Sequence, residues 1–430
     1  METFKYLIVG GGVAGVTAAE TIRDRDKEST IGIVNDEPYI LYSRVMLSKP
    51  AFFLGKIPFD SVWLKGQEWY QKNNIAFLGG KKATGLNTKE KTLTLEDAAA
   101  GDGQTQTIGY EKLLLATGVC ARTWEAEGAE KQGIYYLRTL EDAKKIIDAI
   151  KTAKKAITIG SGFISFEMSD LLRMAGLEVT AVYLEDYYWQ QTLDEVSGKM
   201  VEAALLRMGV KLMRKSAVAK VLGDGKVEGV ILKSGVPIPC DMIVCGIGAY
   251  CAMDWVQKGG VAVNRGILAN EYLETNAPDV WAAGDVAEFK DVIAEEVVQE
   301  GNWVNAHEQG RIAALNMVAS AGVPAAAGAV PLAKEPFKFV SFYTPQGSGI
   351  TIAFAGDVRP LPDRTIIHRG SPETNSYVRF LVVGKELVGA TLINRTQELT
   401  TITNLIKNNV DVSGKLEQLA DPNFDLKTLL

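Results

Sequence analysis

The chain has 430 residues, which is enough for two or three domains with buried cores. Hydrophobic residues make up 47% and charged residues 23%, as in an ordinary globular protein. The net charge of −6 argues against nucleic acid as the main partner, and no apolar run approaches the roughly 18 residues of a membrane helix. Two histidines are too few for a His-rich metal site, so we expect no metal.

The first predicted element is an apolar strand, "FKYLIV", which runs into glycines and then a helix over 13–25. A second strand over 30–34 ends in two acids, Asp36 and Glu37. A GxGxxG turn between a parallel strand and a helix is typical of dinucleotide-binding folds, because the backbone approaches a pyrophosphate there. An acid a little over 20 positions on binds a ribose hydroxyl, and the sequence leaves open which of the two acids does so. The glycines are Gly10, Gly12 and Gly15.

The same pattern returns about 150 residues later. Strand "KAITIG" is followed by Gly160 and Gly162, with Ser165 in place of a third glycine, and by a helix over 164–175. The next strand ends at Glu185, in the ribose-binding position, and the following "DYYWQQ" offers no Arg or Lys for a 2′-phosphate. We therefore expect this second fold to bind NADH in preference to NADPH.

Three further segments are predicted to be buried strands, and two others small antiparallel inserts. The strand over 279–289 contains Gly284 and Asp285, an acid where doubly wound sheets bind ligands. The other strands are 110–118 and 241–249, and the inserts are 77–95 and 217–239.

The tail is predicted to be a separate α+β domain. Residues 321–336 are rich in Ala, Gly and Pro and indicate a linker. Five strands follow over 337–343, 349–358, 365–370, 377–384 and 386–393, with a hairpin at Gly384-Lys385 and a helix over 396–409.

The doubled fingerprint, together with "ATG" at 116–118 and "WAAGD" at 281–285, resembles the FAD- and NAD(P)H-dependent oxidoreductases of the flavoprotein disulfide reductase superfamily. The resemblance covers residues 1–330 and implies an α/β fold with two Rossmann-like domains and a C-terminal α+β interface domain. The implied FAD domain is 1–120 with 265–330, the NAD domain 121–264 and the interface domain 335–430. FAD and NADH would be the cofactors.

The segment over 38–53 indicates the branch. It contains no cysteine, unlike the disulfide reductases, and resembles the R-P-x-L-S-K segment of the ferredoxin, rubredoxin and nitrite reductase flavoproteins. Arg44 and Lys49 match this segment, whereas Val45 replaces its proline. The resemblance implies that Lys49 lies beside the flavin and pairs with Glu167 as the catalytic pair; the alternative is a solvated surface pair.

The resemblance implies further cofactor contacts. Phe163 would cover the nicotinamide pocket, although a core phenylalanine is the alternative. A helix beginning near Trp303 would point its N-terminus at the flavin, and "ATGVCAR" would bring Arg122 to FAD. The complete implied set adds Val13, Ala14, Ala83, Ala116, Thr117, Gly118, Ile164, Gly248 and Val304.

The expected function is electron transfer from NADH through FAD to a small iron–sulfur carrier, a ferredoxin or rubredoxin. Alternatives are an NADH oxidase, a flavoprotein module of a nitrite-reductase-like system, or a nucleotide-bound interaction protein. A set of basic residues in the C-terminal domain either docks an acidic carrier or is scattered and solvated. The set is Arg359, Arg364, His368, Arg369 and Arg379.

The sequence also bears on the location and the oligomeric state of the protein. The four cysteines form no CxxC motif, which favours reduced thiols in the cytoplasm. The first strand begins by about residue 4, so we expect no signal peptide. A homodimer is left open.

Overall fold

A computed structural model describes residues 1–99, 103–323 and 332–430, and its chain divides into two compact units. Unit 1 comprises 1–43, 62–120 and 250–341, and unit 2 comprises 44–61, 121–249 and 342–430. The three-domain boundaries expected from the sequence stay a prediction, and the expected linker over 321–336 lies partly outside the described residues. No helix in the described ranges is long and apolar enough to cross a membrane.

Unit 1 contains a parallel sheet in the order β3-β2-β1-β6, with β18 paired to the other side of β6. The central strands β1 and β2 are mostly apolar and buried, as parallel strands covered on both faces require, whereas β3 at the edge is only partly buried. Two antiparallel strands, β4 and β5, extend the sheet beyond β6. Their bounds are β1 Thr3–Val9, β2 Ile31–Asn35, β3 Ile75–Gly79, β4 Lys81–Asn87, β5 Thr92–Asp97, β6 Thr105–Leu115 and β18 Val280–Ala282. The insert expected over 77–95 is therefore shorter, since residues 77–79 belong to parallel strand β3.

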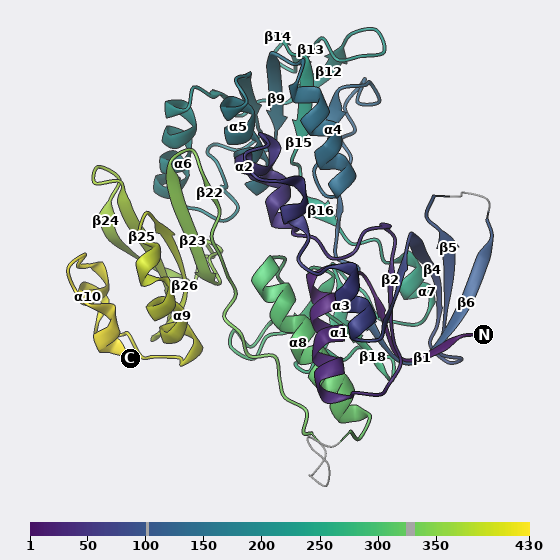
Figure 1. Cartoon of the computed structure of the whole chain (residues 1–430). Coiled ribbons are helices and arrows are strands. Elements are labelled where there is room, and N and C mark those ends of the chain that lie inside the picture. The colour runs from purple at the N-terminus through teal and green to yellow at the C-terminus, as the bar shows by residue number, and fades with distance from the viewer. Residues whose placement is uncertain (100–102, 324–331) are drawn as a thin grey trace. The chain divides into compact units, whose positions relative to one another are not determined.

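Helices α1 (Val13–Arg25) and α8 (Trp303–Ser320) lie side by side in unit 1 (Figure 1). Their backbones approach closely because α8 carries Gly310, where a Cβ would lie 2.2 Å from the carbonyl oxygen of Ala14. The remaining elements of unit 1 are α3 Gln67–Lys72, α7 Asp254–Lys258, β17 Ile267–Ala269, β19 Ala287–Lys290 and β20 Val297–Gln299.

Unit 2 repeats the parallel design in the order β11-β10-β9-β15-β8. A small antiparallel sheet of β12, β13 and β14 occupies 218–239 and confirms the second expected insert. The bounds are β8 Ile134–Tyr135, β9 Lys155–Ile159, β10 Glu178–Val182, β11 Lys211–Met213, β12 Val218–Leu222, β13 Gly229–Leu232, β14 Pro237–Pro239 and β15 Met242–Cys245. The helices are α2 Pro50–Phe53, α4 Leu140–Ile150, α5 Phe163–Met174 and α6 Glu195–Arg207.

The C-terminal part of unit 2 is an antiparallel sheet in the order β21-β23-β26-β25-β24, with β22 paired to β23. Strands β25 and β26 form the expected hairpin across Gly384-Lys385. Only 342–343 of the strand expected over 337–343 pairs in this sheet. The bounds are β21 Phe342–Tyr343, β22 Gln346–Gly347, β23 Ile350–Gly356, β24 Thr365–Ser371, β25 Ser376–Val383, β26 Glu386–Ile393, α9 Leu399–Lys407 and α10 Leu416–Ala420. The α/β fold with two parallel sheets and a C-terminal α+β region is thus confirmed.

Two of the C-terminal arginines, Arg369 and Arg379, are buried and cannot dock a carrier. Arg379 is fully buried, and its Nη2 donates to the carbonyl oxygens of Thr192 and Val358, each at 2.7 Å. Arg369 is 2% exposed and donates to Phe424 O at 2.7 Å. The expectation of a carrier-docking set was wrong for these residues, because the guanidinium groups bind backbone carbonyls inside the unit.

Candidate functional site

The first glycine turn joins β1 to α1 and requires glycine at two positions. Gly10 has φ +118°, and a Cβ there would lie 2.1 Å from the carbonyl oxygen of Ala116. At Gly15 a Cβ would lie 2.0 Å from the carbonyl oxygen of Gly10. Side chains at these positions would push β1, α1 and the end of β6 apart, so both glycines serve the packing of the turn.

Gly12 differs, because a Cβ there would meet no atom of the described residues within 4 Å. Gly12 is also the N-cap of α1, and no side chain caps the helix and no acid lies in its first turn. By contrast α4, α6 and α8 are capped by the side chains of Thr139, Asp194 and Asn302. An uncapped helix N-terminus beside open space fits the negative charge of a pyrophosphate.

The second turn, between β9 and α5, repeats this arrangement in unit 2. Gly160 has φ +104°, and a Cβ there would lie 2.4 Å from Gly246 O. Helix α5 begins after Gly162 with no side-chain cap and no acid in its first turn. Ser165 takes the place of the third glycine, and its Oγ donates to Ile159 O at 2.9 Å. The hydroxyl fits there because residue 246 is a glycine, since a Cβ on that residue would lie 2.6 Å from the Ser165 Oγ.

Sequence reasoning missed Asn35, which braces the first turn from the end of β2. Its Oδ1 accepts from the Gly11 N–H at 3.0 Å, and its Nδ2 donates to Glu37 O at 2.9 Å. The Glu37 carboxylate accepts from Tyr42 OH at 2.7 Å, while Asp36 is exposed and accepts from the Glu37 N–H. The choice between the two acids as ribose partner stays open. A polar residue at the end of an apolar strand was the available signal for Asn35.

Glu185 lies in the loop three residues after β10 and is half-buried. The sequence predicted no cation at this position, but the next strand, β11, ends beside it. The backbone N–H of Lys215 donates to Glu185 O at 3.3 Å, and the Lys215 ammonium pairs with Asp186. Arg214 pairs with buried Glu202 at 2.8 Å. Both cations are therefore already paired with carboxylates.

Lys49 and Glu167 form the expected ion pair within unit 2. Lys49 immediately precedes the short helix α2, Glu167 lies on α5, and Nζ of Lys49 donates to Oε1 of Glu167 at 2.5 Å. Ser48, which is 5% exposed and which the sequence reasoning did not single out, donates its hydroxyl to the other carboxylate oxygen. The Glu167 side chain is 12% exposed and that of Lys49 28%, so the pair is largely shielded from water. An ammonium group has more N–H donors than this one contact uses.

Phe163, the first residue of α5, lies among aromatic rings. Its centroid is 4.6 Å from the indole of Trp189, 5.2 Å from the ring of Tyr343 and 5.8 Å from that of Phe354. Phe163 itself is half-buried, which differs from a fully enclosed core phenylalanine.

The other expected cofactor residues fall into three groups. Gly284 in unit 1 donates its N–H to Gln309, a fully buried α8 residue that the sequence reasoning missed, at 2.7 Å. In unit 2, Arg122 donates to Ala249 O at 3.1 Å and Arg44 to Arg138 O at 3.0 Å. Val13, Ala14, Ala116, Thr117, Gly118, Asp285, Trp303 and Val304 belong to unit 1 with the first turn, Ile164 and Gly248 belong to unit 2 with the second, and Ala83 is buried in the core beside β5.

Two of the four cysteines are buried thiols. Burial raises the pKa of Cys240 and of Cys245 to about 12, so both thiols stay protonated at neutral pH. Cys120 is exposed and Cys251 half-buried, and none of the four forms a disulfide. Among the described residues no group of His, Cys, Asp and Glu could hold a metal ion.

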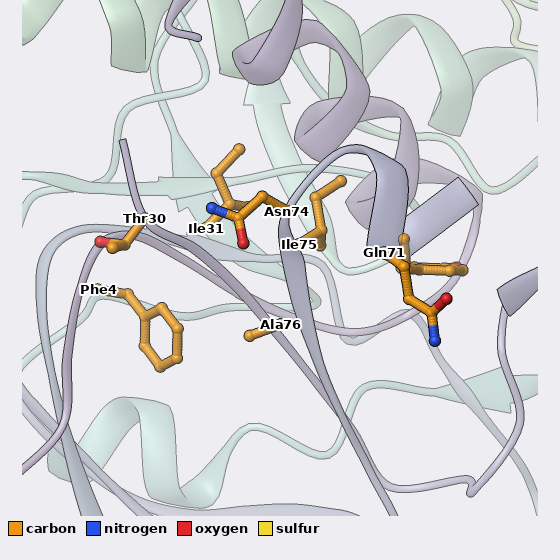
Figure 2. A pocket seen from close by; sticks show the side chains of 8 residues that line it. Phe4, Thr30, Ile31, Gln71, Asn74, Ile75 and Ala76 are labelled. Carbon is orange, nitrogen blue, oxygen red and sulfur yellow. The ribbon is translucent and has the colours of Figure 1, made fainter. Parts of the chain in front are cut away.

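A small pocket in unit 1 lies away from the glycine turn (Figure 2). Phe4, Ile31 and Ile75 line it, at the amino ends of β1, β2 and β3, whereas Gly10 follows the carboxyl end of β1. Doubly wound sheets bind cofactors at their carboxyl edge, so we do not assign this pocket to a nucleotide.

Comparison with known proteins assigns the family. The model of the pyridine nucleotide-disulphide oxidoreductases matches residues 4–310. The chain belongs to this family. Its members use FAD and NAD(P)H, and a second model, the reductase C-terminal domain, matches residues 342–430. The resemblance identified from the doubled fingerprint is confirmed.

Relatives and solved structures agree with this assignment. The ferredoxin–NAD(+) reductase component of the biphenyl dioxygenase system of Paraburkholderia xenovorans (strain LB400) is 29% identical over 98% of the chain and 97% of that protein. The nitrite reductase [NAD(P)H] of Bacillus subtilis (strain 168) is 27% identical over 95% of the chain, which spans 48% of that protein. In the crystal structure of the covalent putidaredoxin reductase–putidaredoxin complex, one chain is 26% identical and superposes with a TM-score of 0.88, over 100% of this chain and 98% of that one.

Proposed function

We propose that this oxidoreductase transfers electrons from NADH through FAD to a small iron–sulfur carrier of the ferredoxin or rubredoxin type. The observation that carries the proposal is the pair of uncapped helix N-termini, α1 and α5, each following a glycine turn at the carboxyl end of a parallel strand. The ferredoxin reductase relative, which matches nearly its whole length, supports the choice of acceptor.

FAD is assigned to the α1 turn and NADH to the α5 turn. The open space at Gly12 fits a pyrophosphate, and a carboxylate at Asp36 or Glu37 would accept from the FAD ribose. At the second turn, Gly162 leaves similar room, since a Cβ there would have Gly246 O at 3.7 Å as its neighbour.

The reaction consumes one NADH and two oxidised carriers, and yields NAD⁺, one proton and two reduced carriers. FAD supplies the conversion between a hydride, which carries two electrons, and single-electron steps. The chain contributes charge and position. The Lys49 ammonium is held by Glu167, whose carboxylate also accepts from Ser48. It would offer a hydrogen-bond donor to the flavin ring, and Phe163 would cover the nicotinamide pocket until NADH enters.

The preference for NADH is supported by the charges around Glu185. A free 2′-hydroxyl would donate to the Glu185 carboxylate, whereas a 2′-phosphate would be repelled by it. Lys215 and Arg214 do not offset this repulsion while Asp186 and Glu202 hold them. The side chain of Lys215 is 70% exposed, so its pairing with Asp186 is weak. Of the charges near Glu185, the Lys215 ammonium is therefore the one that a substitution would release most easily.

A second candidate function is the flavoprotein module of a nitrite-reductase-like system. The observation that favours it is the match to about half of the Bacillus subtilis nitrite reductase. In that case the acceptor would be a partner domain or subunit rather than a diffusing carrier. A homodimer and a cytoplasmic location stay predictions from the sequence.

The decisive experiment is steady-state oxidation of NADH with a panel of ferredoxins, rubredoxins, nitrite reductase partner domains and oxygen. We expect at least one small iron–sulfur carrier to be reduced far faster than oxygen. Ferricyanide reduction, which requires no docking, serves as the control for flavin reduction by NADH. Rapid ferricyanide reduction with no activity toward any carrier would refute the proposed acceptor and leave the NADH half-reaction intact.

A further inference from the structure

Trp189 has three features that packing alone does not explain. It lies in the loop after β10, where it is 4% exposed and has φ +58°. Left-handed φ is rare for a bulky residue and is strained, because its Cβ approaches the following carbonyl. Strained residues of this kind cluster at functional sites, where the surrounding structure holds them in place.

The indole N–H of Trp189 is buried, and no hydrogen-bond acceptor among the described residues reaches it. Buried tryptophans usually find a partner for this group. Trp281 shares this property in unit 1 but has ordinary backbone, so only Trp189 of the two combines it with left-handed φ.

The backbone of Trp189 also contacts the second glycine turn. The backbone N–H of Trp189 donates to the carbonyl oxygen of Ser161 at 3.2 Å, between Gly160 and Gly162. The loop that carries Glu185 is thereby tied to the turn where α5 begins. Ser161 is 7% exposed, so this hydrogen bond is shielded from water.

The indole ring makes the second connection. It contacts Phe163 at 4.6 Å between centroids, with an interplanar angle of 47°, and Phe166 at 5.2 Å. Phe163 is the first residue of α5 and Phe166 lies one turn further along, so the ring supports the first turn of the helix from one side. Tyr343 and Phe354 contact Phe163 in edge-to-face geometry.

We infer that Trp189 is a positioning residue of the nicotinamide-nucleotide site, which its ring supports through Phe163 and its backbone through Ser161. The inference rests on the proposed binding of NADH at α5. Trp189 touches no reacting atom in this role. It sets the position of the Phe163 ring and the shape of the glycine turn, and so determines how readily the nucleotide enters.

The test compares three variants of the FAD-loaded protein. Trp189→Leu removes the aromatic ring, Trp189→Phe keeps a ring but not the N–H, and Tyr188→Phe is the matched control. Tyr188 is the neighbouring buried aromatic residue, and its ring contacts Tyr183 rather than Phe163. The measurements are KM and kcat for NADH with ferricyanide, the Kd of NAD⁺ by calorimetry, FAD content and melting temperature.

We expect Trp189→Leu to raise KM and the Kd of NAD⁺ about tenfold, with kcat within twofold of the parent and FAD content unchanged. Trp189→Phe should restore both constants to within about threefold, and Tyr188→Phe should match the parent. Unchanged constants in Trp189→Leu would overturn the inference. So would equal impairment of Trp189→Phe, or a change shared by Tyr188→Phe, which would indicate general loosening of the core.

Failure of the proposed function is distinguishable from failure of this inference. If the parent protein neither binds NAD⁺ nor oxidises NADH, the proposed function is wrong before any variant is compared. If the parent does both and the three variants match it, the assigned role of Trp189 alone is wrong.

Discussion

Replacing Gly10 and Gly12 with alanine should separate folding from cofactor binding within one turn. At Gly10 the new methyl would lie 2.1 Å from Ala116 O at φ +118°, against the backbone of Ala116 and Thr117. Strained φ costs about 1–3 kcal/mol and overpacking about as much again, against a total stability of about 5–15 kcal/mol. At Gly12 the methyl meets no described atom within 4 Å at an unstrained φ of −76°, so the fold should change by less than about 0.5 kcal/mol.

For FAD binding we expect the opposite ranking, with Gly12→Ala causing the large effect. The Gly12 methyl would occupy the space beside the α1 N-terminus where we place the pyrophosphate, and we expect FAD affinity to fall at least about 100-fold, or about 2.7 kcal/mol. FAD content and FAD titration of stripped protein measure this. Melting is compared on the FAD-stripped forms, because bound ligand itself stabilises the fold.

In that comparison Gly12→Ala should melt within about 2 °C of the parent, and Gly10→Ala at least about 4 °C lower. Full-affinity FAD binding by Gly12→Ala would refute the assignment of the pyrophosphate to the α1 N-terminus. An unshifted melting temperature in Gly10→Ala would refute the packing argument instead.

Replacing Glu185 and Asp186 together with alanine removes a repulsive carboxylate and frees the Lys215 ammonium. The ratio of kcat/KM for NADPH to kcat/KM for NADH should therefore rise at least about tenfold. An unchanged ratio would contradict the assignment of the ribose position. Lys49→Met should slow flavin reduction by NADH and shift the flavin absorbance, while the melting temperature stays nearly unchanged. Ser48→Ala should have the same effects but more weakly, because Glu167 then keeps its contact with Lys49 and loses only the one with Ser48. Identical stopped-flow traces for parent and Lys49→Met would return this lysine to a structural role. Burial opposes ionisation of Asp26, but hydrogen bonds from neighbouring side chains outweigh it and lower its pKa to about 2, so its stabilisation is present above about pH 4 and lost as the pH falls toward 2. Urea midpoints of Asp26→Asn should therefore lie below the parent at pH 6 and converge with it at low pH, and parallel curves would contradict this.

The features that were predicted from sequence are those with strong local causes. A glycine turn between a buried strand and a helix is specified by backbone sterics, so Gly10 and Gly160 identified both dinucleotide folds correctly. The hairpin at Gly384-Lys385 follows from local turn chemistry in the same way. The pairing of Lys49 with Glu167, 118 residues apart, came from family resemblance rather than from any local signal.

Features that depend on long-range packing were missed or misread. Arg369 and Arg379 looked like surface charges, because a sequence does not show that backbone carbonyls will surround a guanidinium group. Lys215 was overlooked as a neighbour of Glu185, since parallel pairing of β10 and β11 brings together residues separated by a whole helix. The "YYW" stretch at 187–189 was interpreted either as an adenine stack or as an exposed loop of bulky residues, whereas Trp189 is buried. Neither its left-handed φ nor its unpartnered N–H can be read from the residue type.

The interleaving of the two units along the chain has a consequence for synthesis on the ribosome. Strand β18 pairs with β6, yet about 165 residues separate them, and α8 follows later still. Unit 1 cannot complete its sheet until residues 280–282 have emerged, and until then the edge of β6 that β18 will cover stays unpaired. The nascent chain therefore exposes an apolar strand edge while about 165 further residues are added, a state in which holdase chaperones bind and in which truncated products aggregate. Expression of fragments ending before residue 280 should yield insoluble protein, whatever happens to the cofactor sites.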